Sequence, residues 1–91
     1  MSAPPAPSAE EVLGVLRRAC ATVLEVDAAG IGRDTRFVED LHADSLALVE
    51  IVEIVEEELA PRVGSGFHLD DEQLDGLSTV GEAADAALAR L

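Results

Sequence analysis

The sequence lacks tryptophan, tyrosine and lysine, and it has one cysteine and two phenylalanines among 91 residues. A single cysteine excludes an internal disulfide and argues against a zinc site built from thiolates. Cys20 stands among apolar residues at helical spacing, and we expect a buried, structural thiol there. Because aromatic residues are few and no long β-branched run alternates apolar with polar residues, the composition favours helices over strands.

Segments that direct a chain to or across a membrane are also missing. Residues 1–7 carry no basic residue and no apolar core, so we do not expect a signal peptide. No apolar run approaches the length that spans a bilayer. We therefore expect a cytoplasmic protein without a membrane partner. The proline-rich residues 1–7 are predicted to be a disordered tail, and the length of the chain allows one domain, residues 8–91.

Negative charge is abundant and unevenly placed. Nineteen acidic residues stand against six basic ones, all arginine, which gives a formal net charge of −13. Such a surface repels nucleic acid and anionic lipid, but it attracts basic protein partners and speeds their encounter. Residues 37–60, called the acidic segment below, contain no arginine and eight acids: Glu39, Asp40, Asp44, Glu50, Glu53, Glu56, Glu57 and Glu58. This concentration favours a basic protein partner over a merely solvated acidic surface.

Hydrophobic periodicity predicts a first helix that begins with Ser8 as N-cap, with Glu11 reaching back to it in a capping box. We expect it to end near residues 25–26. Its apolar positions are Val12, Leu13, Leu16, Ala19, Cys20, Val23 and Leu24. In the loop that follows, Ile31 and Phe37 are expected to plug the core.

A second main helix is predicted to begin at Asp44 or Ser45. It is expected to stop before Pro61, because proline disfavours a helical conformation in the residue that precedes it. Its core stripe consists of Leu48, Ile51, Val52, Val55 and Leu59. A separate, acidic face consists of Glu50, Glu53 and Glu57. This pattern is typical of a helix that packs on a core with one side only.

Residues 70–76 are predicted to form a short helix, and the last helix has Ser78 or Thr79 as its N-cap. The inner positions of that last helix are Val80, Ala83, Ala84, Ala87, Leu88 and Leu91. The expected fold is all-α: a small antiparallel four-helix bundle with three main helices and one short helix. We expect this bundle to be a monomer.

Ser45 is the leading candidate for a functional residue. A serine at a helix start is usually only a cap, but Asp44 can cap this helix and leave the Ser45 hydroxyl free in solvent. A phosphodiester on Ser45 would be tolerated, because helix N-termini favour phosphate. A hydrolytic triad of His42, Asp44 and Ser45 is disfavoured, because adjacent residues seldom reach triad geometry. We therefore predict no catalytic activity, and we interpret His42 and His68 as loop residues.

A partial calcium-loop pattern lies further along the chain. Its residues are Asp71, Gln73, Asp75, Gly76 and Glu82, at loop positions 1, 3, 5, 6 and 12. Position 3 is glutamine, position 8 is the polar Ser78, and the preceding segment is rich in glycine rather than helical. Since an acidic chain produces partial matches easily, we predict no specific metal site. A calcium-responsive or scaffolding helical protein remains the alternative from another functional class.

Residues 37–46, Phe-Val-Glu-Asp-Leu-His-Ala-Asp-Ser-Leu, closely resemble the acyl carrier protein family. The family pattern is Asp-Ser-Leu at the start of the second helix, preceded by Phe-x-Glu-Asp-Leu-Gly. The resemblance extends over residues 8–91 and includes Leu-Ser-Thr-Val before the last helix. It implies that Ser45 carries 4′-phosphopantetheine, added from coenzyme A by a phosphopantetheinyl transferase, and that acyl groups are held on it as thioesters.

The resemblance also implies a partner surface along the second helix. Its residues are Asp44, Leu46, Val49, Glu50, Glu53, Glu56 and Glu57. The implied partners are the transferase, an acyltransferase or acyl-activating enzyme, and a ketosynthase or other pathway enzyme with a basic docking patch. The acids are individually weak contacts, and together they would act on encounter rate and orientation.

The chain departs from the pattern of fatty-acid carriers at several positions. His42 replaces the usual glycine, which is expected to alter the turn before Ser45. Ala47 stands where an acid is usual, Glu53 stands where methionine is usual, and residues 61–68 lengthen a connection. These departures favour a discrete carrier of a polyketide or related specialised pathway over a housekeeping fatty-acid carrier. An aminoacyl or peptidyl carrier is the alternative within the same class.

Overall fold

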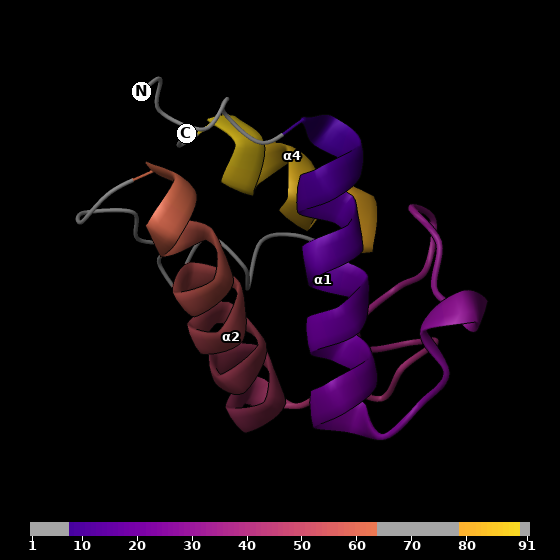
Figure 1. The fold of residues 1–91 in the computed structure, drawn as a ribbon. Helices are drawn as coiled ribbons and strands as arrows, with labels where there is room; N and C mark the ends of the chain where they lie inside the picture. The colour runs from indigo at the N-terminus through magenta and orange to yellow at the C-terminus, as the bar shows by residue number, and fades with distance from the viewer. Residues whose placement is uncertain (1–7, 64–78, 90–91) are drawn as a thin grey trace, which may run out of the picture.

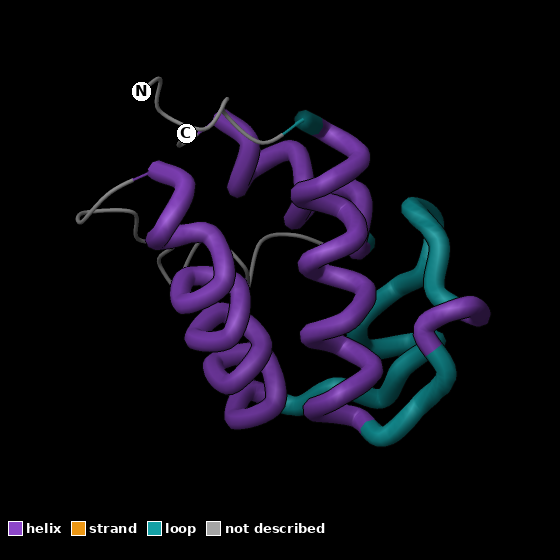
Figure 2. Tube along the Cα trace, viewed as in Figure 1, coloured by secondary structure: helices purple, strands orange, loops and turns teal. Residues whose placement is uncertain are grey.

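A computed structural model describes residues 8–63 and 79–89, without the side chains of residues 61–63. The elements are α1 (Ala9–Leu24), the short 3-10 helix η1 (Ala28–Gly30), α2 (Ser45–Val63) and α4 (Val80–Ala89). Figure 2 shows that these helices are joined by loops, without a strand in the described ranges. The predicted all-α bundle is confirmed. The predicted tail over residues 1–7 and the short helix over 70–76 lie outside the described residues.

The ends of α1 follow from local hydrogen bonds. Ser8 accepts a hydrogen bond from the Glu11 amide at 3.2 Å, and the Glu11 carboxylate accepts one from the Ser8 amide at 3.4 Å. This is the predicted capping box. At the other end, Glu25 adopts a left-handed conformation with φ 56° and closes the helix by donating to the Ala21 carbonyl. The predicted end of α1 is therefore confirmed.

The predicted end of α2 is wrong. The helix begins at Ser45 as expected, but it continues through Pro61 to Val63. Proline fixes φ near a helical value, but it removes one backbone donor and crowds the carbonyl four residues earlier. Pro61 lies in the last turn of α2. A proline ring disfavours a helical conformation in the residue before it, but this preference did not end the helix at residue 60.

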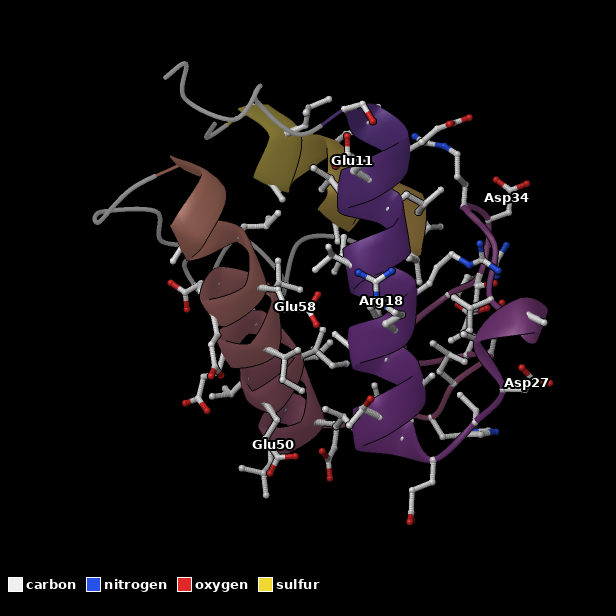
Figure 3. The ribbon with its side chains drawn as sticks, viewed as in Figure 1. Glu11, Arg18, Asp27, Asp34, Glu50 and Glu58 are labelled. Carbon is white, nitrogen blue, oxygen red and sulfur yellow. The ribbon has the colours of Figure 1, made fainter. Side chains whose placement is uncertain are left out.

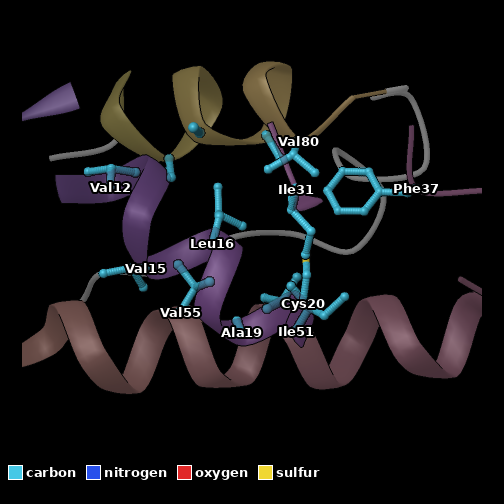
Figure 4. Packing of buried hydrophobic residues seen from close by; sticks show 14 of the residues in the cluster. Val12, Val15, Leu16, Ala19, Cys20, Ile31, Phe37, Ile51, Val55 and Val80 are labelled. Atoms are coloured by element: carbon cyan, nitrogen blue, oxygen red, sulfur yellow. The ribbon is translucent and has the colours of Figure 1, made fainter. Parts of the chain in front are cut away.

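The core is built around α1, which contacts α2 on one side and α4 on the other (Figures 1 and 4). Among the described residues, the buried hydrophobic ones are Val12, Val15, Leu16, Ala19, Cys20, Ile31, Phe37, Ala43, Ile51, Val52, Val55, Leu59, Val80, Ala83, Ala84 and Ala87. Each fully buried large aliphatic or aromatic side chain contributes about 1.5–3 kcal/mol. Most predicted core positions are confirmed, while Leu13, Val23, Leu24, Leu48 and Leu88 are only partly buried against the cluster. The predicted inner position Leu91 lies outside the described residues.

Side-chain contacts also join separate elements of the fold. Arg18 on α1 and Glu58 on α2, both labelled in Figure 3, form an ion pair at 3.3 Å. Arg17 donates a hydrogen bond at 2.9 Å to the Ala28 carbonyl and so ties η1 to α1. An exposed ion pair contributes little, so the Arg18–Glu58 pair orients the two helices more than it stabilises them. None of the described helices is long and apolar enough to cross a membrane.

The loop between α1 and α2 is anchored in the core at two points. Ile31 and Phe37 retain 3% and 2% of their exposure, as predicted for residues that plug the core. Between Phe37 and α2, the Ala43 amide donates to the Phe37 carbonyl at 2.8 Å, and the His42 amide donates to the Val38 carbonyl at 3.1 Å. Backbone hydrogen bonds therefore fix the conformation of residues 36–43, which are called the turn below.

His42 occupies a position of this turn with φ 55°, in the left-handed region that glycine enters without steric cost. The substitution of histidine for the usual glycine therefore strains the backbone, but it leaves the hydrogen bonds of the turn in place. Asp40 supports the same turn, because its carboxylate accepts a hydrogen bond from the Arg36 amide at 2.8 Å.

The loop is also bonded to the first turn of α4. The amides of Val80 and Gly81 donate to the carbonyls of Thr35 and Arg33, both at 2.9 Å. A Cβ added to Gly81 would lie 2.9 Å from the Arg33 carbonyl oxygen, which is backbone and cannot swing away. Thr79 caps the helix, as one of the two predicted caps, by accepting from the Glu82 amide at 3.1 Å. Glycine at position 81 thus permits the closest approach of loop and helix.

We predict that Gly81→Ala lowers the free energy of unfolding by about 1–3 kcal/mol, because the added methyl overlaps the Arg33 carbonyl. Gly14→Ala is the matched control. Its Cβ would meet only the end of the Arg18 side chain at 3.6 Å. Since alanine is the better helix former, that change should raise the free energy of unfolding by about 0.5–1 kcal/mol. Urea unfolding followed by circular dichroism measures both, and equal effects would contradict the close contact.

His42 offers a second test. We expect His42→Gly to raise the free energy of unfolding by about 0.5–1 kcal/mol, since it removes the left-handed strain. His42→Val should lower it by about 1–2 kcal/mol, because a β-branched residue tolerates positive φ poorly. The same urea titration compares the two variants with the wild type. If valine proved as stable as glycine, the left-handed assignment would be wrong.

Candidate functional site

Ser45 is the first residue of α2, and its side chain is exposed. The Asp44 carboxylate accepts a hydrogen bond from the Ala47 amide at 2.8 Å, and the Asp44 carbonyl accepts one from the Leu48 amide at 3.0 Å. Asp44 is therefore the N-cap, as the sequence predicts. Because Asp44 satisfies the helix end, the Ser45 hydroxyl is not needed there and can react with a group from outside.

The surroundings of Ser45 are strongly negative. Four acids of the predicted partner surface are exposed: Asp44, Glu50, Glu53 and Glu57. Glu56, the fifth acid of that surface, is half-buried. Figure 3 places the labelled Glu50 near the start of α2. These four exposed acids attract a basic surface at long range.

In the described part of the chain, arginine side chains pair with the acidic segment at two places. Arg36 pairs with Glu39 in the turn, and Arg18 pairs with Glu58 from α1. The hydrogen bond and charge of Glu39, with the charge of Asp40, raise the pKa of Arg36. Both arginines pair with acids at the margins of the segment, so the negative charge around Ser45 itself persists.

Apolar side chains also lie beside Ser45. Leu46 is 67% exposed and Val49 is half-buried, and both belong to the predicted partner surface. Val38, in the turn, is 64% exposed. The sequence analysis did not predict that Val38 is exposed. An apolar residue next to the core residue Phe37 could equally well have been buried, and no pattern in a loop distinguishes the two cases. The site therefore combines an exposed hydroxyl, acids and exposed apolar groups.

The alternatives to a modified serine gain nothing from the structure. In the described ranges no hydrogen bond joins His42 to Asp44 or Ser45, and the Asp44 carboxylate is engaged by the Ala47 amide. Of the partial calcium loop, residues 71–76 lie outside the described part of the chain. Glu82 lies in the first turn of α4, where its carboxylate accepts a hydrogen bond from the Thr79 hydroxyl at 3.2 Å.

The position of Ser45 suits a covalently attached phosphodiester. Its hydroxyl is exposed, and it stands at the N-terminal end of a 19-residue helix, whose dipole favours a negative group there. Asp44 places a negative charge beside it, which offsets part of that preference.

The chain is similar to known proteins over most of its length. A family model described as the phosphopantetheine attachment site matches residues 14–87. An acyl carrier protein of Rubrobacter xylanophilus is 37% identical over 76 residues, which cover 84% of this chain and 86% of that protein. An acyl carrier protein of Lactobacillus acidophilus is 34% identical over 76 residues, which cover 84% and 88%. The chain belongs to the acyl carrier protein family, and it is an acyl carrier with phosphopantetheine as its cofactor, not an enzyme.

Proposed function

We propose that Ser45 is the residue that carries 4′-phosphopantetheine, within a carrier domain of residues 8–91. One observation carries the proposal. The Asp44 carboxylate caps α2 by accepting a hydrogen bond from the Ala47 amide at 2.8 Å, so the exposed Ser45 hydroxyl is not needed as the cap. The residue lies inside the segment that matches the phosphopantetheine attachment family. His42 supplies no base through a hydrogen bond, so activation of the hydroxyl belongs to the partner enzyme.

The attachment step is a phosphoryl transfer from coenzyme A. The Ser45 Oγ attacks the phosphorus that bears the pantetheine, and the bond from that phosphorus to the pyrophosphate bridging oxygen breaks. Adenosine 3′,5′-bisphosphate leaves, and the hydroxyl proton passes to a base of the transferase. Catalysis of such a transfer consists mostly of positioning and charge stabilisation, which the transferase supplies. This chain contributes an accessible oxygen on a rigid helix end.

Once attached, the arm supplies a terminal thiol that holds an acyl group as a thioester. The chain's own residues present the arm to enzymes. We propose that partner enzymes bind a surface made of Asp44, Leu46, Val49, Glu50, Glu53, Glu56 and Glu57. The complementary surface on each enzyme would be a basic patch. Its acids would raise the rate of encounter, and its apolar residues would contribute contact area after encounter.

For the pathway, we propose a discrete carrier of polyketide or related specialised metabolism. Four departures from fatty-acid carriers support this: His42, Ala47, Glu53 and the connection over residues 61–68. The corresponding partners are an acyltransferase or acyl-activating enzyme and a ketosynthase. The similarity to acyl carrier proteins favours acyl over aminoacyl cargo. Loading by acyl-activating and amino-acid-activating enzymes, measured side by side, separates these two cargoes.

The attachment site is tested by intact mass. Incubation of the apo-protein with coenzyme A and a promiscuous phosphopantetheinyl transferase should add one phosphopantetheine, and Ser45→Ala should abolish the gain. Ser8→Ala is the matched control, since Ser8 is also an exposed serine at a helix start and should leave the gain unchanged. A mass gain in Ser45→Ala, or none in the wild type, would refute the assignment.

Cys20 makes a second test possible. Burial raises the pKa of the Cys20 thiol to about 11, so near neutral pH it is protonated and shielded from solvent. Because the thiolate is the reactive form, maleimide should label the folded holo-protein once, on the arm, and leave the folded apo-protein unlabelled. In denaturant each form should gain one additional label. Labelling of Cys20 in the folded apo-protein would contradict its burial.

A further inference from the structure

Two exposed apolar side chains flank Ser45. Val38 and Leu46 are 64% and 67% exposed, and in the described part of the chain only Val26, at 40%, is a comparable large hydrophobic residue. Isolated exposed apolar residues are common and need no explanation. These two differ from Val26 in their place. Leu46 directly follows Ser45, and the Val38 carbonyl is bonded to the amide of His42, three residues before Ser45.

Val38 is held in place rather than carried on a flexible loop. Its carbonyl accepts the His42 amide at 3.1 Å, and the neighbouring Phe37 is buried in the core and accepts the Ala43 amide at 2.8 Å. Leu46 is held by the first turn of α2. Valine also has little rotamer freedom to lose. Covering these residues would therefore cost little conformational entropy.

The charge around this apolar pair restricts what can cover it. The turn carries Glu39 and Asp40, and α2 carries Asp44 and Glu50, all exposed. A surface that covers Val38 and Leu46 must bring these acids close to its own rim. Only a face with apolar groups at its centre and lysine or arginine around them complements this arrangement.

Resting on the assignment of Ser45 as the attachment site, we propose that Val38 and Leu46 together dock the phosphopantetheinyl transferase. The docking surface then includes the turn as well as α2. The transferase must bring the phosphorus of coenzyme A to within about 3–3.5 Å of Ser45 Oγ, so it lies over the start of α2. The His42 and Ala43 amides bond the turn to the residues just before that start, which brings Val38 within reach of the same enzyme. Enzymes that act on the acyl group reach it through the arm and need not cover Val38.

The test compares isosteric variants of the apo-protein, Val38→Thr and Val26→Thr. Threonine keeps the shape of valine and replaces one methyl by a hydroxyl. The kcat/KM for arm transfer from coenzyme A should fall about fivefold in Val38→Thr and less than twofold in Val26→Thr. Leu46→Gln should also lower it. Thermal unfolding checks that the exposed substitutions leave the fold intact.

A binding readout complements the rates. When the transferase is added to apo-protein labelled with ¹³C in its methyl groups, the resonances of Val38 and Leu46 should shift and those of Val26 should not. If the wild type is loaded while Val38→Thr matches Val26→Thr, the transferase docks on α2 alone and this inference is wrong. If the wild type never gains the arm on Ser45, the proposed function itself fails.

Discussion

Phe37 is 2% exposed, while the residues on both sides of it lie at the surface. Its ring is close to Ile31 and Val80 in the view of the core in Figure 4, where loop and α4 meet. This burial fixes one end of the turn, and α2 begins directly after the other end. The position of Ser45 therefore depends on an aromatic ring eight residues earlier, held by the same core that joins α1, α2 and α4.

Ser45 is available for reaction because its neighbour Asp44 caps the helix. Helix starts need an acceptor for their unpaired amides, and serine is among the residues that supply one. Here Asp44 supplies it, and Thr79 does the same for α4. The acid next to Ser45 is thus a structural requirement of the helix as well as a part of the negative surface. Replacing it would disturb both the helix start and the field that a basic partner encounters.

Local sequence rules predicted much of this fold. The capping box at Ser8 and the cap at Asp44 depend on residues three apart, and helical stripes report burial directly. Rules of this kind failed where a local preference was too weak to decide the outcome and where distant parts of the chain meet. They placed the end of α2 too early at Pro61. They gave no sign that Gly81 permits contact with the Arg33 carbonyl, or that Val38 faces solvent beside a buried neighbour.

The acids and the apolar groups of this surface act over different distances. Charge attraction between a −13 chain and a basic face extends over about 8–10 Å at physiological salt, so it recruits basic surfaces with little discrimination. Apolar contact begins only when surfaces touch, and it depends on shape. Selection among basic partners must therefore come from groups with fixed positions near Ser45. Val38 and Leu46 meet that requirement, because the turn and the first turn of α2 hold them in place.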